Sequence, residues 1–185
     1  MILIVLALLC LASVPLTGGK LGRLADLRVR GTWVPVLALA LQVVIVTIAP
    51  GGNPALHKAV HIATYGLIGL FLWLNRRVPG VRLVALGAFL NALAIVVNGG
   101  VMPASVTAQR LAGLHVGSGF QNSAALAHPY LPFLGDIIPW PGPLPNVLSV
   151  GDCIIYIGTL LLLHRVCGRR AVRRAPALTP ARDSA

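Results

Sequence analysis

The sequence of 185 residues is 57% hydrophobic and 10% charged, with a mean hydropathy of +0.86. This composition excludes an ordinary water-soluble domain, because too few polar side chains remain to cover its surface. The formal net charge is +11. The basic residues flank apolar runs and are not interleaved with aromatic residues, which argues against nucleic acid as a partner and favours anionic lipid headgroups.

Apolar runs predict an all-α membrane protein, a single domain over residues 1–168 with five transmembrane helices. Each run is close to the lower limit of about 17 residues for a helical span. The first run has no basic residue before it and several after it, the reverse of a secretory signal, so it is predicted to be a retained span. The five runs cover about residues 1–17, 33–49, 59–74, 83–97 and 147–163.

Basic residues are distributed unevenly over the connections between these runs. Thirteen of the 15 Lys and Arg residues lie in residues 18–31, in residues 76–82 or in the tail from Arg165. The other two are Lys58 and Arg110. By the positive-inside rule, the protein is predicted to lie in a bacterial plasma membrane with its N-terminus outside and its C-terminus cytoplasmic. The basic tail, residues 169–185, is predicted to be disordered and held near anionic lipid.

The connection between the fourth and fifth runs, residues 98–147, is predicted to lie outside and to carry structure. It is too long for a structureless loop in a compact domain. Pro103 and Ser105 are helix-start signals, so a helix is expected near residues 104–115. A second short helix is expected from Asn122 to Ala127, and the Pro-rich run at residues 139–145 predicts an extended path back to the membrane.

Two carboxylates in apolar surroundings, Asp136 and Asp152, are the candidate catalytic residues. If they converge, repulsion and partial burial leave a pair that shares one proton, which can activate water and protonate a leaving group. A structural interpretation is equally concrete. Ser149 can be the N-cap of the last helix with Asp152 at its N3 position, and Asp136 can cap a turn.

These two segments resemble the conserved boxes of lipoprotein signal peptidase, a membrane aspartic peptidase. Leu134-Gly135-Asp136-Ile137 is similar to that family's Val-Val-Asp-Phe box, and residues 149–158 are similar to the box that opens its final helix. The resemblance implies that Asp136 and Asp152 are the catalytic carboxylates. Ser149 stands where that family has Asn, and the family's Gly-Asn-x-x-Asp-Arg box is absent.

A resemblance over nearly the whole chain is to a family of small bacterial membrane proteins of unknown function. It rests on residues 98–105, Asn122-Ser123, Leu134-Gly135-Asp136 and residues 149–152. This resemblance implies the five-span architecture and no particular activity. The polar residues that would position a substrate are Asn98, Ser105, Asn122, Asn146 and Ser149.

Two further polar groups have structural alternatives. Asn91 and Asn98 share a helix face, where they can point toward the Asp pair or join helices by hydrogen bonds; joining helices is the favoured interpretation. The segment with Lys58, His61 and Tyr65 resembles a box of the VanZ-like membrane proteins. His57 replaces the Asp of that box, and an interfacial belt of amphipathic side chains explains the segment equally well.

Two functions remain open at the level of sequence, and neither calls for a metal or another cofactor. The favoured one is a non-enzymatic membrane protein that binds a lipid-linked envelope component or a membrane-protein partner through the long connection. The alternative is an exterior-facing aspartic hydrolase that uses Asp136 and Asp152. Local capping bonds at each Asp favour the first, and a shared water-accessible cleft favours the second.

Overall fold

Five long helices form the body of the protein in the computed structural model, which describes residues 2–44, 54–114 and 123–168. The long helices are α1 (Ile2–Leu16), α2 (Trp33–Val43), α3 (Pro54–Leu74), α4 (Val81–Val97) and α6 (Val150–Cys167). The short helices are η1 (Leu21–Asp26), α5 (Val106–Leu111) and η3 (Pro132–Leu134). The strands are β1 (Met102–Pro103), β2 (Ser123–Ala124), β3 (Asp136–Trp140) and β4 (Asn146–Ser149).

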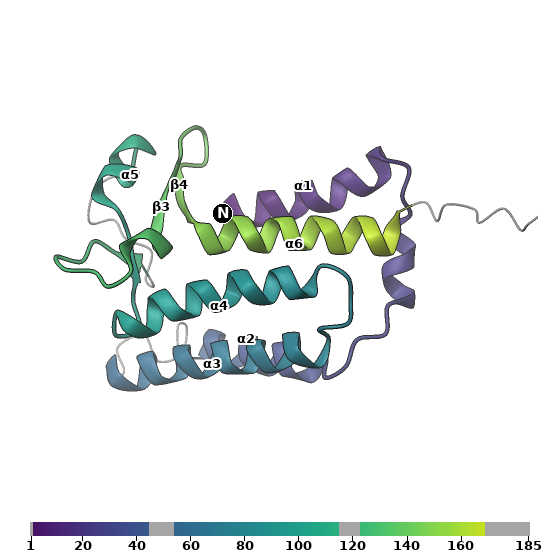
Figure 1. The fold of residues 1–185 in the computed structure, drawn as a ribbon, viewed down its shortest axis with the longest axis horizontal. Coiled ribbons are helices and arrows are strands. Elements are labelled where there is room, and N and C mark those ends of the chain that lie inside the picture. Colours follow the sequence, from purple (N-terminus) through teal and green to yellow (C-terminus); the bar gives the residue numbers. More distant parts are fainter. Residues whose placement is uncertain (1, 45–53, 115–122, 169–185) are drawn as a thin grey trace, which may run out of the picture.

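The long helices lie side by side in the order α1, α6, α4, α3, α2 (Figure 1). Helix α6, the last of these five long helices in sequence, therefore lies between α1 and α4. All the elements between α4 and α6 gather at one end of the bundle, whereas η1, the α3–α4 turn and the end of α6 lie at the other.

The helices agree closely with the predicted apolar runs. Helix α6 begins at Val150 and not at residue 147, because residues 146–149 form β4. Of the described residues, only α6 forms a helix of sufficient length and apolarity to cross a membrane. The apolar stretches in the other four long helices, as far as they are described, are shorter than 18 residues. The predicted disordered tail, residues 169–185, lies outside the described residues.

Pairs of glycines bring α4 and α6 close together. A Cβ on Gly151 would lie 2.7 Å from the carbonyl oxygen of Gly87, and one on Gly158 would lie 3.0 Å from that of Gly80. Such distances leave no room for a side chain at any of the four positions. Gly151 and Gly158 lie seven residues apart on α6, and Gly87 of α4 lies seven residues after Gly80, the residue that precedes α4, so both pairs lie on the same antiparallel contact.

The connection from residue 98 to residue 149 contains strands that the all-helical prediction omitted. Strand β1 pairs with β2 in parallel, and β3 pairs with β4 as an antiparallel hairpin. The predicted helix near residues 104–115 is present as the shorter α5, with Ser105 as its N-cap. The second predicted helix is wrong in its described part, since Ser123 and Ala124 form β2 instead. The Pro-rich run was expected to follow one extended path, but it turns back between β3 and β4, which pair as a hairpin.

The other end of the bundle is held by bonds between distant segments. The backbone N–H of Lys20 donates to the carbonyl oxygen of Cys167 over 2.9 Å, and the Arg23 guanidinium donates to the carbonyl oxygens of Cys167 and Gly168. The Asn75 side chain, which is buried, bonds both the N–H and the C=O of Arg30. These bonds join the first connection to the last helix and to the α3–α4 turn.

Candidate functional site

Asp152 lies in the first turn of α6, where it forms a capping box with Ser149. The Ser149 N–H donates to Asp152 Oδ2 over 3.0 Å, and the Asp152 N–H donates to Ser149 Oγ over 2.9 Å. The capping box satisfies two backbone donors, and the carboxylate also lies at the positive end of the helix dipole. The structural interpretation of Ser149 and Asp152 is therefore confirmed.

Asn91, on α4, joins this cap to the neighbouring helix. Its Nδ2 donates to Asp152 Oδ1 over 2.8 Å, and its Oδ1 accepts from Ser149 Oγ over 2.9 Å. Asp152 thus accepts hydrogen bonds on both carboxylate oxygens, and Ser149 is fully buried. The preferred interpretation of Asn91, a hydrogen-bonded link between helices, is confirmed, and the same amide also reaches one of the candidate carboxylates.

Asp136 is the first residue of β3 and is partly buried. Its Oδ2 accepts a hydrogen bond from Ser123 Oγ over 2.7 Å, and its carbonyl oxygen accepts from the Ser105 N–H over 2.9 Å. The pKa of this carboxyl is raised from 3.8 to about 6, mainly by burial; the hydrogen bond from Ser123 opposes this rise, and the charge of Asp152 adds to it. Asp136 can therefore gain or lose a proton near neutral pH.

The strand pairing brings Asp136 to the start of α6. Asp136 pairs with Ser149 in the β3–β4 hairpin, and Ser149 is the residue whose N–H holds the Asp152 carboxylate. The charges of both carboxylates also act on the Tyr65 side chain of α3. The two Asp residues are thus electrostatically coupled, but they differ in their bonding: the Asp152 carboxylate takes part in a helix cap, whereas the Asp136 carboxylate accepts a hydrogen bond from the Ser123 hydroxyl.

In the described structure, the side chains of the other predicted site residues do not bond to either Asp carboxylate. Asn98 joins α4 to the connection, because its side chain bonds both the N–H and the C=O of Tyr130. Ser105 is the N-cap of α5, and its Oγ accepts from the Ala108 N–H over 3.2 Å. Asn146 lies at the far end of the hairpin opposite Trp140. Asn122 lies outside the described residues, as do the side chains of His57, Lys58 and His61.

The structure adds Ser123 and Tyr65 to the surroundings of the carboxylates. Ser123 is next to Asn122 in a segment that the sequence singled out, but nothing in its spacing pointed to Asp136. No metal site accompanies the pair, since within the described ranges no three His, Cys, Asp or Glu side chains gather in a way that could hold an ion.

These observations define a helical-bundle protein whose strand-containing connection is fastened over one end of the bundle. Residues 26–164 match a family of unknown function (DUF5317), and the chain belongs to this family. The resemblance found in the sequence is thereby confirmed. The matched range includes both candidate carboxylates and excludes the whole of α1.

One curated relative is an uncharacterized protein of Thermotoga maritima, which is 37% identical over 93 residues. The aligned part is 49% of this chain and 54% of the relative, so the chain matches about half the length of that protein. No solved structure matches the chain.

Proposed function

We propose that the protein spans a bacterial plasma membrane five times, through α1, α2, α3, α4 and α6. Exposed aromatic side chains at both ends of the bundle support this arrangement. Trp33 and Trp73, which are 64% and 63% exposed, lie toward the end with η1, and Tyr130 and Trp140, 70% and 40% exposed, lie on the connection at the opposite end. Aromatic residues at two levels are typical of the two membrane interfaces.

The orientation follows from the basic residues. Residues 18–31, residues 76–82 and the end of α6 lie at one end of the bundle, and these segments hold eight of the ten Lys and Arg residues in the described ranges. This end is the cytoplasmic one by the positive-inside rule, and the connection between α4 and α6 then lies outside.

Labelling of introduced cysteines in cells tests both points. In a variant without the native cysteines, Arg110→Cys should react with a membrane-impermeant maleimide in intact cells, and Arg77→Cys only after permeabilisation. The reverse pattern would overturn the orientation. Labelling of both positions in intact cells would overturn the membrane-spanning arrangement.

The exterior connection, in this proposal, binds a lipid-linked envelope component and performs no catalysis. The observation that carries the proposal is a set of exposed apolar side chains on a segment that is itself firmly bonded to the bundle. Tyr130, whose backbone is bonded by the Asn98 side chain, is 70% exposed, and Phe133 of η3 is 60% exposed. Trp140 lies on the β3–β4 hairpin. Large rigid aromatic side chains supply contact area at low entropic cost.

Trp140 can report on this binding directly. In a Trp33→Phe/Trp73→Phe variant in nanodiscs, Trp140 is the remaining tryptophan, and a polyprenyl-diphosphate-linked sugar should change its emission in a saturable way. Adding Tyr130→Ala and Phe133→Ala should remove the change, whereas Val29→Ala at the opposite end should not. The absence of any saturable change in the starting variant would overturn the proposal.

A hydrolase is the second candidate, favoured by the pKa of about 6 at Asp136 and by its coupling to Asp152. Its weakness is the bonding of Asp152, whose two oxygens accept from Ser149 and Asn91. Incubation with a lipidated signal-peptide substrate, as lipoprotein signal peptidase would cleave, distinguishes the two. Turnover that is lost in both Asp136→Asn and Asp152→Asn, with the fold retained, would establish the hydrolase.

A further inference from the structure

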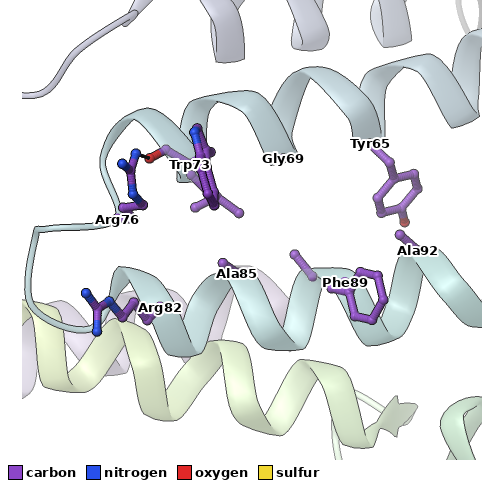
Figure 2. A pocket seen from close by; sticks show the side chains of 10 residues that line it. Tyr65, Gly69, Trp73, Arg76, Arg82, Ala85, Phe89 and Ala92 are labelled. Atoms are coloured by element: carbon purple, nitrogen blue, oxygen red, sulfur yellow. Dashed lines mark hydrogen bonds between the residues drawn. The ribbon is translucent and has the colours of Figure 1, made fainter.

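A groove runs between α3 and α4 on the side of α4 that faces away from α6 (Figure 2). Its volume is about 520 Å³. Its walls include Trp73 of α3 and Phe89 of α4, which are 63% and 61% exposed, and small residues such as Ala85 and Ala88 leave space between them. Tyr65 lies at one end of the groove.

Two arginines, Arg76 just after α3 and Arg82 at the start of α4, lie at the other end of the groove, one on each side of it (Figure 2). The Arg76 side chain is fixed by Trp73: its Nη1 donates to the Trp73 carbonyl oxygen over 2.9 Å, and its Cζ lies 4.2 Å from the centre of the indole ring. No carboxylate in the described part of the chain forms an ion pair with either arginine. The groove therefore has a long apolar section and, at one end, a positive charge from two arginine side chains.

A second, smaller pocket of about 300 Å³ shares Arg76 with the groove and continues the positive charge. It is lined by Arg28, Arg30 and Arg77 together with Asn75, whose side chain holds the backbone of Arg30 in place. Guanidinium groups bind phosphate oxygens with paired, charge-assisted hydrogen bonds. Several of them around one opening form a site for a phosphate group.

The length of the groove matches one leaflet of a bilayer. From Tyr65 to its last residue, Leu74, α3 rises about 14 Å, at about 1.5 Å per residue. Half of a hydrocarbon core that is about 30 Å thick is nearly the same length. A partner helix that crosses the whole membrane would continue past Tyr65, whereas a lipid chain from one leaflet ends there.

We infer that the groove binds an anionic glycerophospholipid of the leaflet on the basic side, with an acyl chain between Trp73 and Phe89 and the phosphate at Arg76 and Arg82. This inference rests on the proposed placement in a membrane and is independent of the ligand proposed for the exterior connection. The adjoining arginines select an anionic headgroup over a zwitterionic one, because cationic side chains near a membrane surface attract anionic lipid.

Trp73 lines the groove and can report on the lipid. A Trp33→Phe/Trp140→Phe variant keeps Trp73 as the remaining tryptophan, and bromine atoms on an acyl chain quench its fluorescence on contact. In phosphatidylcholine vesicles, brominated phosphatidylglycerol should quench Trp73 at a concentration at least about fivefold lower than brominated phosphatidylcholine, the factor that one guanidinium near the surface contributes. Equal quenching by the two lipids would overturn the inference but leave the membrane placement intact.

Two pairs of variants separate this site from general attraction to the surface. In the same background, Arg76→Gln/Arg82→Gln should lower the preference for phosphatidylglycerol about fivefold or more. Lys20→Gln/Arg165→Gln removes the same charge at the same end outside the groove and should preserve it. An equal loss in both would overturn the inference. Ala88→Phe should reduce quenching by both lipids, whereas Leu86→Phe, on the same helix but outside the groove, should not.

The remaining outcomes identify other occupants. No quenching of Trp73 by either lipid, together with disulfide-linked dimers of an Ala88→Cys variant, would assign the groove to a second copy of the chain and overturn the lipid site. No quenching and no cross-link would mean that Trp73 does not contact lipid. That result would contradict the proposed membrane placement as well.

Discussion

Helix α4 meets its two neighbours in different ways. On the side of α6, Gly80 and Gly87 lie against Gly158 and Gly151, and Asn91 adds two hydrogen bonds to the start of α6. On the side of α3, the helices remain far enough apart to leave a groove of about 520 Å³. One helix therefore carries both the closest helix contact described here and an open surface.

The difference teaches that glycine brings helices together only when the opposite helix also offers one. Gly66 and Gly69 of α3 are as small as Gly87, but a Cβ added at either meets nothing within 4 Å. At the α4–α6 contact each glycine faces another, so the two backbones can approach. Between α3 and α4, Gly69, Ala85 and Ala88 line the open groove, so their small size leaves space there and does not bring the backbones together.

Substitution of Gly87 should have the largest effect. A Cβ at this position would lie 2.8 Å from Ile155 Cγ1 and 2.9 Å from the Ile155 backbone nitrogen, and backbone atoms cannot turn aside as a side chain can. Gly87→Leu should therefore cost about 4 kcal/mol of unfolding free energy or more. Gly66→Leu is the matched control and should cost less than about 1 kcal/mol. Thermal unfolding of the purified proteins in detergent measures both, and equal losses would refute the close contact.

The pH dependence of stability tests the α4–α6 side of the bundle, at the point where Asp136 of the connection pairs with Ser149 before α6. Because the pKa of Asp136 is raised from 3.8 to about 6 in the folded protein, the folded state binds this proton more tightly than the unfolded chain. The unfolding free energy should then fall by on the order of 3 kcal/mol as the pH rises from about 4 to about 7. Asp136→Asn should remove this slope.

The control for this prediction is Asp26→Asn, at the exposed end of η1, which should keep the slope of the parent protein. Urea unfolding in detergent at a series of pH values provides the measurement. A slope that persists in Asp136→Asn would mean that another group is responsible.

Loss of Asn91 should have the next largest effect. Asn91→Leu removes the partner of Asp152 Oδ1 and of Ser149 Oγ, so the expected cost is about 2 kcal/mol. Thr159→Val removes a hydroxyl that bonds only within α6, over 2.8 Å to Ile155, and should cost less than about 0.5 kcal/mol. If the two variants unfold at the same temperature, the Asn91 link contributes no stability.

The smallest effect on stability should come from filling the groove. Ala88→Phe places a large side chain in open space between α3 and α4, so the unfolding free energy should change by less than about 0.5 kcal/mol. A loss above about 1 kcal/mol would show that the two helices close on each other there, as α4 and α6 do. The same unfolding assay in detergent decides between the two results.

The helices could be predicted from the sequence because their signals are local. Apolar runs bounded by glycine, proline and charge located all five long helices to within a few residues in the described part. The end of α4 was also predictable, since Gly99 takes the left-handed conformation expected after a helix, with a φ of 68°. Ser149 and Asp152 stand three residues apart, the spacing of a capping box, and the structure contains that box.

The strands could not be predicted from the sequence for two reasons. Two of them pair with a segment that is distant in sequence, and a third contains a proline. Strands β1 and β2 have two residues each and pair across about twenty residues of chain. Strand β3 contains Pro139, which argues against a strand in any local interpretation. Such short strands depend on the surrounding structure more than on their own sequence.

Of the two candidate carboxylates, only the surroundings of Asp152 could be predicted from the sequence. The cap at Asp152 is local, but the bond from Ser123 to Asp136 depends on the packing of the whole connection. The glycine pairs were also missed, although Gly80 and Gly87, and Gly151 and Gly158, repeat at a spacing of seven residues. That repeat was the available signal for the contact between α4 and α6.

The position of α6 between α1 and α4 has a consequence for biosynthesis. Ser13 of α1 lies 2.9 Å from the ring of His164, and Cys10, Val14, Leu163 and Cys167 form one buried cluster. Helix α1 therefore obtains its packing partner from α6, which is synthesised after all the other described helices. A nascent chain that stops before Val150 leaves both α1 and the glycine face of α4 without that partner, so the bundle cannot be completed before α6 has been synthesised.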